Sequence, residues 1–187
     1  MALARTKQED RSDRAESELI AAARQGSTDA LGELYDRHAS RVLAMAFRLL
    51  QSTDEAEDVV HDVFVGLPEL LRRYEERGTF AAWLKKVAAR VALTRILEDS
   101  RRPTISLDEL AQHPHTPVHD VEGVMSLEQA MRSLTPSLRA VLVLKEIEGF
   151  SHAEVARLLD ISVGASEVRL HRAIQALRAA LTHGDHQ

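Results

Sequence analysis

Apolar residues recur every three or four positions along much of this chain, and this spacing constrains its fold more than any other feature. Between residues 52 and 71 the apolar stripe is Ala56, Val59, Val60, Val63, Leu67 and Leu70, and between 29 and 51 it includes Leu31, Leu34, Val42, Ala46 and Leu49. Such spacing lines one face of a helix. Glycine and proline are scarce, with 8 and 5 of 187 residues, and the alternation typical of strands is absent. We therefore predict an all-α fold.

Four helices are predicted in the first part of the chain. Their approximate spans are 14–25, 29–51, 52–71 and 80–99. Gly26 would end the first helix, and Ser52 with Glu55 three residues later has the spacing of a capping box. We expect these helices to form one N-terminal domain, residues 1–102.

Residues 103–124 have a different composition, with three prolines, three histidines, four acidic residues and no Lys or Arg. This composition predicts a linker with at most a short helical turn near residues 107–111. The histidines His113, His115 and His119 lack a preformed geometry and a fourth ligand, so we do not predict a metal site there.

A second helical domain is predicted over residues 125–187. Its helices would span about 125–133, 136–148, 151–159 and 163–182. Thr135 is placed to cap the second of these helices, and Ser151 with Glu154 forms another capping-box pattern. The last two helices, joined by a tight turn near Asp160 with Ala156 and Ile161 at the joint, predict a helix-turn-helix.

The composition excludes several classes of protein. The absence of cysteine excludes disulfides, thiolate catalysis and cysteine-based zinc sites. The chain has no apolar run of roughly 20 residues and no signal peptide, so we expect a cytoplasmic protein. The sequence contains no nucleophile–base pair, glycine-rich phosphate loop or HExxH-type motif, so we predict neither an enzyme nor a cofactor.

Charge is unevenly distributed although the net charge is only −5. Residues 52–71 carry six acids and no Lys or Arg, whereas residues 84–102 carry six bases and two acids. Carboxylates near a helix N-terminus are stabilising, which accounts for Asp54 but not for Asp62, more than two turns into the helix. The i,i+4 pairs Asp54–Asp58 and Asp58–Asp62 repel one another. A basic partner surface would relieve this repulsion, so we predict an interface there.

Aromatic and basic residues are concentrated between residues 74 and 102. The aromatic residues are Tyr74, Phe80 and Trp83, and the bases include Lys85, Lys86, Arg90 and Arg95. Aromatic faces beside cations are typical of surfaces that bind single-stranded nucleic acid. The alternative is that Phe80 and Trp83 belong to the core and that the bases form a solvated face.

Three segments, in this order, resemble the extracytoplasmic-function (ECF, group 4) sigma factors of bacterial RNA polymerase. Residues 54–64, DEAEDVVHDVF, resemble the polymerase-binding segment of that family, and residues 78–88, GTFAAWLKKVA, resemble its promoter-melting segment. Residues 134–162, LTPSLRAVLVLKEIEGFSHAEVARLLDIS, resemble the start of its C-terminal DNA-binding domain. The resemblance covers roughly residues 15–182.

The resemblance implies a transcription-initiation factor with three surfaces. One would dock on the clamp helices of the polymerase largest subunit through Asp54, Glu55, Glu57, Asp58 and Asp62. A second would capture the unpaired −10 element through Tyr74, Phe80, Trp83, Lys85, Lys86, Arg90 and Arg95. The last helix would read the −35 duplex through Ser162, Ala165, Glu167, Val168, Arg169, His171 and Arg172. The resemblance also implies an anti-sigma partner, and a linker that threads the polymerase active-site cleft and RNA exit path.

Three residues depart from the family pattern. Arg90 stands where most members have an Asn that helps hold a flipped base, Glu167 replaces a basic residue, and Ser166 replaces a buried Val. These departures leave the promoter preference open.

Two other functions are compatible with the same helices. A helix-turn-helix regulator acting without polymerase would bind duplex DNA tightly as a dimer, but would leave the acidic helix unexplained. A sigma mimic that sequesters an anti-sigma factor would keep the apolar faces and lose the basic ones. A gel-shift experiment with and without core polymerase distinguishes the three.

Overall fold

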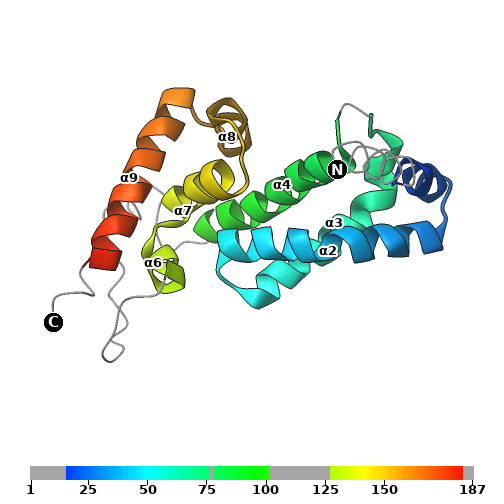
Figure 1. The fold of residues 1–187 in the computed structure, drawn as a ribbon, viewed down its shortest axis with the longest axis horizontal. Coiled ribbons are helices and arrows are strands. Elements are labelled where there is room, and N and C mark those ends of the chain that lie inside the picture. Colours follow the sequence, from blue (N-terminus) through cyan, green and yellow to red (C-terminus); the bar gives the residue numbers. More distant parts are fainter. Residues whose placement is uncertain (1–15, 76–77, 102–126, 183–187) are drawn as a thin grey trace, which may run out of the picture. The chain divides into compact units, whose positions relative to one another are not determined.

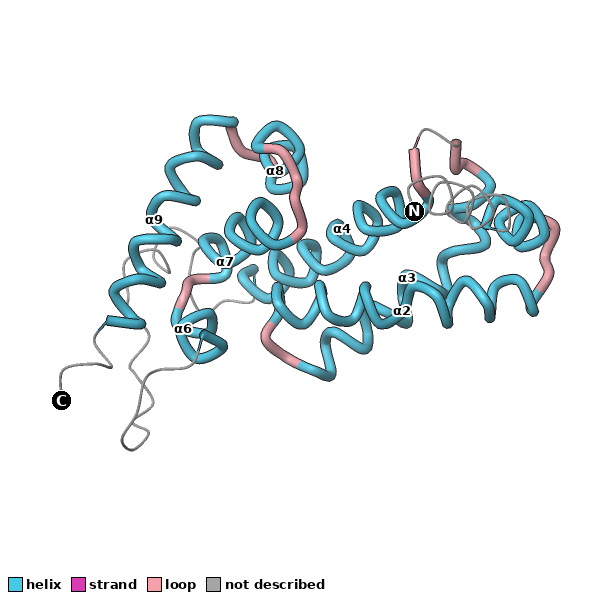
Figure 2. The backbone as a smooth tube through the Cα atoms, viewed as in Figure 1, coloured by secondary structure: helices cyan, strands magenta, loops and turns pink. Residues whose placement is uncertain are grey.

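The computed structural model describes residues 16–75, 78–101 and 127–182, apart from the side chains of 99–101. Within these residues every regular element is a helix, which confirms the predicted all-α fold (Figures 1 and 2). None of the described helices is long and apolar enough to cross a membrane. The turn predicted near 107–111, Arg102, and the histidines at 113, 115 and 119 lie outside the described residues. The chain forms two compact units, Met1–Phe47 with Ser52–Val91, and Arg48–Gln51 with Ala92–Gln187.

The helices of the first part of the chain begin and end close to the predicted residues. After a first helix at residues 16–24 come α2 (Thr28–Leu50), α3 (Thr53–Arg72) and α4 (Phe80–Arg101) (Figure 1). The first helix ends at Gly26, whose φ of 90° lies in the left-handed region that glycine adopts without a steric penalty. At the start of α3 the Ser52 hydroxyl accepts a hydrogen bond from the backbone N–H of Glu55 at 3.3 Å.

The apolar stripe predicted for α3 forms part of the core of the first unit. Ala56, Val59, Val60, Val63 and Leu67 are all buried. At the end of the stripe Leu71 is fully buried and Leu70 only partly, one position later than predicted. A helix has 3.6 residues per turn, so either residue can continue the stripe after Leu67, and only the packing partners decide between them.

The second unit contains α6 (Leu127–Ser133), α7 (Pro136–Leu142), the π-helical turn η1 (Val143–Ile147), α8 (His152–Leu159) and α9 (Val163–Thr182). The last helix packs against α6, α7 and α8 (Figure 1). The α-helix predicted over 136–148 was wrong in its last turn, because the backbone N–H of Glu148 reaches back five residues to the carbonyl of Val143. Val143 and Leu144, the first two residues of this wider turn, are buried in the core.

The helix-turn-helix predicted for the last two helices is present in the second unit. Ser151 and Glu154 form the complete capping box at the start of α8. Asp160 ends α8 in the left-handed conformation, with φ of 52°, and the N–H of Ile161 donates to the carbonyl of Ala156 at 3.0 Å. This left-handed residue reverses the chain within a few residues and so sets the start of α9 against α8.

Candidate functional surfaces

The acidic residues of α3 lie away from its buried stripe. Asp54, Glu55, Glu57, Asp58 and Asp62 are all exposed. Helix geometry places Asp54, Asp58 and Asp62 one above another on neighbouring turns. The predicted docking residues therefore form a continuous acidic face in the first unit.

An apolar groove lies beside this acidic face, between α2 and α3. It has a volume of about 730 Å³, and its lining residues are mostly apolar: Leu31, Gly32, Tyr35, Ala39, Leu43, Val60, Phe64 and Val65, with Ser40, Glu57 and His61. Tyr35 and Phe64 meet edge to face across it, with ring centroids 4.9 Å apart. Because Glu57 lines the groove, the acidic face of α3 and the apolar groove are adjacent.

The sequence pattern did not predict this groove. Two residues could have indicated the groove: Tyr35 and Val65 lie outside the predicted apolar stripes, and they are 46% and 66% exposed. Two large apolar side chains off the buried face of adjacent helices indicate either an interface or an unfilled groove. The sequence alone does not place these two helices side by side.

The three aromatic residues near the start of α4 form one cluster. The Tyr74 ring centroid lies 5.7 Å from that of Phe80 and 4.7 Å from that of Trp83, and the Phe80 and Trp83 centroids are 5.5 Å apart. Tyr74 and Phe80 are only 5% and 2% exposed, whereas Trp83 is partly exposed. A base could stack on Tyr74 or Phe80 only if the ring left the core. Trp83 is the member of the cluster at the surface.

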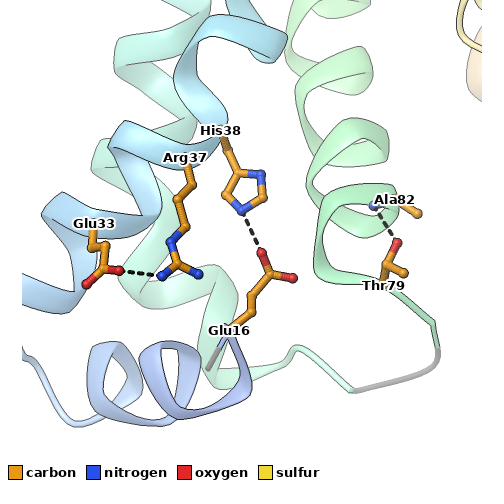
Figure 3. A network of polar contacts seen from close by, with 6 residues as sticks. All are labelled: Glu16, Glu33, Arg37, His38, Thr79 and Ala82. Carbon is orange, nitrogen blue, oxygen red and sulfur yellow. Dashed lines mark hydrogen bonds and ion pairs between the residues drawn. The ribbon is translucent and has the colours of Figure 1, made fainter. Parts of the chain in front are cut away.

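The basic residues of α4 follow one side of the helix. Ala82, Lys86, Arg90 and Thr94 are exposed at intervals of four, and Lys85 and Arg95 are partly exposed beside them. On the other side of the helix the apolar side chains, including that of Leu84, are buried. The helix begins at an N-cap in which the Thr79 hydroxyl accepts from the N–H of Ala82 at 3.3 Å (Figure 3). The cap and the buried side together orient a cationic face toward solvent.

The last helix presents its predicted DNA-reading residues near its N-terminus. Ser162 caps the helix by accepting a hydrogen bond from the N–H of Ala165 at 3.0 Å. The exposed members of the predicted set are Ser162, Glu167, Val168, His171 and Arg172, and the partly exposed ones are Ala165 and Arg169. The predicted set therefore lies at the surface at the start of α9.

A polar contact inside the helix-turn-helix was missed. Ser166 is fully buried, and its Oγ lies 2.9 Å from Nδ1 of His152, which opens α8. The sequence did identify Ser166 as a polar residue at a position that is usually apolar. It did not identify the partner, because His152 lies 14 residues earlier in the chain.

Comparisons with known proteins agree with this architecture. The family profile for sigma-70 region 2 matches residues 34–102, and that for sigma-70 region 4 matches residues 125–177. The chain is 31% identical to the ECF RNA polymerase sigma factor SigE of Mycolicibacterium smegmatis over 78% of this chain and 59% of that protein's length. It is also 31% identical to the RNA polymerase sigma factor CarQ of Myxococcus xanthus, over 84% of this chain and 92% of CarQ.

Solved structures give the same result. CnrH, solved in complex with the cytosolic domain of CnrY, is 31% identical and superposes with a TM-score of 0.56 over 91% of this chain and 97% of CnrH. The sigma factor RpoE of Bartonella quintana, solved with the anti-sigma factor NepR, shares the fold at 20% identity and a TM-score of 0.58, over 81% of this chain and 96% of RpoE. The chain therefore belongs to the extracytoplasmic-function group of the sigma-70 family, whose members are transcription initiation factors of RNA polymerase.

Proposed function

We propose that this chain binds core RNA polymerase and directs initiation at promoters that it recognises by their −10 and −35 elements. In this proposal residues 1–102 dock on polymerase and open the −10 element, residues 103–124 link the two domains, and residues 125–187 read the −35 duplex. The observation that carries the proposal is the presence, on one chain, of an acidic face on α3, a basic face on α4 and a helix-turn-helix.

The acidic face of α3 supports docking on a basic protein surface. Opposite charges steer two proteins together, and an adjacent apolar groove supplies area that can be buried once they meet. The groove between α2 and α3 provides that area next to Glu57. We therefore include Tyr35 and Val65 with Asp54, Glu55, Glu57, Asp58 and Asp62 in the proposed polymerase surface.

The basic face of α4 supports capture of the −10 strand. Lys85, Lys86, Arg90 and Arg95 would follow the phosphates, and Trp83 offers a partly exposed ring for a base. Extruding a base from the duplex costs a few kcal/mol, which stacking and a fitted pocket can offset. Tyr74 and Phe80 would support that pocket from the core. The protein would contribute binding and no catalysis of its own.

The start of α9 supports recognition of the −35 duplex in the major groove. Arg169 or Arg172 can pair with guanine through two hydrogen bonds, and His171 can bind phosphate. Glu167 would repel phosphate and could accept from a cytosine amine, and Ser162, Ala165 and Val168 would complete the contact surface.

A regulatory partner is also proposed. Because CnrH was solved with the cytosolic domain of CnrY, we infer that this chain is held inactive by an anti-sigma factor in the cytoplasm, where polymerase also acts.

A charge reversal on α3 tests polymerase docking. The double variant Asp58→Lys with Asp62→Lys should bind core polymerase at least about tenfold more weakly, because like charges facing each other at an interface cost several kcal/mol. The matched control is Glu18→Lys with Asp36→Lys, two exposed acids outside α3, which changes the net charge equally. Affinity is measured by titration with core enzyme, and circular dichroism checks the fold. Unchanged binding by the α3 variant would rule out this surface.

A further inference from the structure

The first helix, residues 16–24, lies outside the segment that matches sigma-70 region 2 and outside every surface described above. Two of its side chains nevertheless contact either the aromatic cluster itself or a residue that packs against it. We propose that this helix is a positioning element for promoter opening, in which Arg24 and Glu16 hold the two ends of the loop between α3 and α4. The proposal rests on the proposed role of that loop and of α4 at the −10 element.

Arg24 holds the end of the loop that follows α3. Its Nε–H donates to the backbone carbonyl of Leu71 at 2.9 Å, and its Nη2 donates to the carbonyl of Tyr74. The guanidinium also lies 5.6 Å from the centroid of the Tyr74 ring. The carbonyl of Leu71 is one of the last carbonyls of α3, which carry the negative end of the helix dipole, so a cation that donates to it contributes both a hydrogen bond and a favourable charge. Arg24 therefore fixes both the backbone and the ring of Tyr74.

Glu16 holds the other end of the loop through His38. His38 is 4% exposed, and its Nε2 lies 2.9 Å from Oε1 of Glu16 (Figure 3). The His38 ring meets the ring of Phe80 edge to face, with centroids 5.2 Å apart. Phe80 is the first residue of α4. Glu16 therefore acts on the start of α4 by orienting the imidazole that packs against it.

The charge state of His38 suits this role. Burial lowers the pKa of His38, the adjacent Glu16 carboxylate offsets part of that shift, and Arg37 and Arg41 lower the pKa further. The lowered pKa favours the neutral imidazole. A carboxylate can only accept, so the ring carries its hydrogen on Nε2 and donates it to Glu16.

The two contacts act at opposite ends of the segment between α3 and α4. Glu16 and Arg24 are eight residues apart, which is about 12 Å along a helix. One contact lies at Tyr74, where α3 has ended, and the other acts at Phe80, where α4 begins. The rings of Tyr74 and Phe80 in turn pack against Trp83. Holding these rings before DNA arrives would spare the protein the cost of ordering them during melting.

The test uses the full-length chain and three readouts. They are acrylamide quenching of Trp83, the single tryptophan of the chain, affinity for core polymerase, and open-complex formation on duplex and on pre-melted templates. We expect Arg24→Leu to expose Trp83 to the quencher and to slow opening of the duplex by about tenfold, as two hydrogen bonds to backbone carbonyls are lost. Core affinity and activity on the pre-melted template should stay within about twofold of wild type, because neither step needs the rings of Tyr74 and Phe80 to be held in advance.

Arg72→Leu is the matched control for charge. Arg72 is exposed in the last turn of α3 and pairs with Glu69 at 2.9 Å, so this variant removes a cation from the same helix end without removing the Arg24 contacts. It should leave Trp83 quenching and promoter opening unchanged. Arg24→Lys, which keeps the charge but not the forked donor, should give an intermediate loss.

A second pair of variants covers the case in which Arg24→Leu fails to fold. Glu16→Ala should slow duplex opening by about threefold, the effect of one lost hydrogen bond, while Glu18→Ala on the exposed side of the same helix should not.

Normal quenching and normal opening in Arg24→Leu and Glu16→Ala would overturn the proposal. An equal loss on duplex and pre-melted templates would also overturn it, because it would indicate general destabilisation. If wild type neither binds core polymerase nor opens promoters, the proposed function fails, while Trp83 quenching still tests the positioning role.

Discussion

At His38, burial and a neighbouring carboxylate act in opposite directions on one imidazole. Burial is the larger effect, so the pKa of His38 is lower in the folded chain than the ordinary value near 6.5. The unfolded chain then binds a proton more readily than the folded one. The stability that the neutral form provides is complete above the ordinary pKa and is lost as the pH falls through that value toward the folded pKa.

We therefore expect the first unit to lose stability as the pH falls from about 7 to 5. Urea unfolding at several pH values, followed by the fluorescence of Trp83, measures this loss. His38→Gln should flatten the pH dependence, whereas His61→Gln, at an exposed histidine of α3, should not. In Glu16→Ala the carboxylate that raises the pKa is gone, so NMR titration should give a still lower pKa for His38. A pKa at or above the ordinary value in the wild-type chain would contradict this account.

At the scale of the element, the helix-turn-helix depends on a polar pair where an apolar contact is usual. The buried hydroxyl of Ser166 and the ring of His152 join the starts of α9 and α8. A buried polar group costs free energy when its partner is removed, whereas replacing both partners by apolar groups can be nearly neutral. The pair should therefore behave as a unit.

His152→Ala should destabilise the second unit by about 1–3 kcal/mol, because the Ser166 hydroxyl is left buried without its partner. Adding Ser166→Ala should recover a large part of that loss, so the two substitutions should be non-additive. Thermal unfolding of the single and double variants measures this coupling, and promoter affinity in the presence of core polymerase shows whether α9 stays in place. Ser133→Ala, a substitution at a hydroxyl that donates to the carbonyl of Ala130 in α6, is the control. Strict additivity would show that the two side chains act independently.

In the proposed function, a single chain binds two DNA elements and one protein partner. Binding the second element then becomes intramolecular, so affinity depends on the separation of the two elements. We expect a promoter-specific gel shift only in the presence of core polymerase. A five-base-pair insertion between the elements rotates the −35 site by about half a turn and should abolish most initiation. A ten-base-pair insertion restores the rotation but not the distance, so comparing the two insertions separates the effect of rotation from the effect of distance.

The alternatives predict different results in the same gel-shift experiment. A regulator that acts without polymerase would shift a duplex tightly on its own and would elute as a dimer. A sigma mimic would bind an anti-sigma factor and form no promoter complex. Either result would contradict the proposed function.

The amino-acid sequence was enough to predict the helices and the distribution of charge. The apolar period, the cap residues Ser52, Thr135 and Ser151, and Gly26 placed the ends of most helices, because caps and turns act within a few residues of one another. The same period predicted which side of α3 is exposed and acidic. The π-turn, in which Val143 and Leu144 are buried, was missed, because such turns are rare and its residues keep the apolar spacing of an α-helix.

Which aromatic residues are buried, and which distant residues meet, depends on how the helices pack against one another. The pattern around Phe80 and Trp83 fits a core and a base-stacking surface equally well, and packing against His38 and Tyr74 put Phe80 inside. Arg24 reaches residues 47 and 50 positions away. The physical reason is that local periodicity reports which side of a helix is apolar, whereas a long-range contact depends on which helices that side packs against.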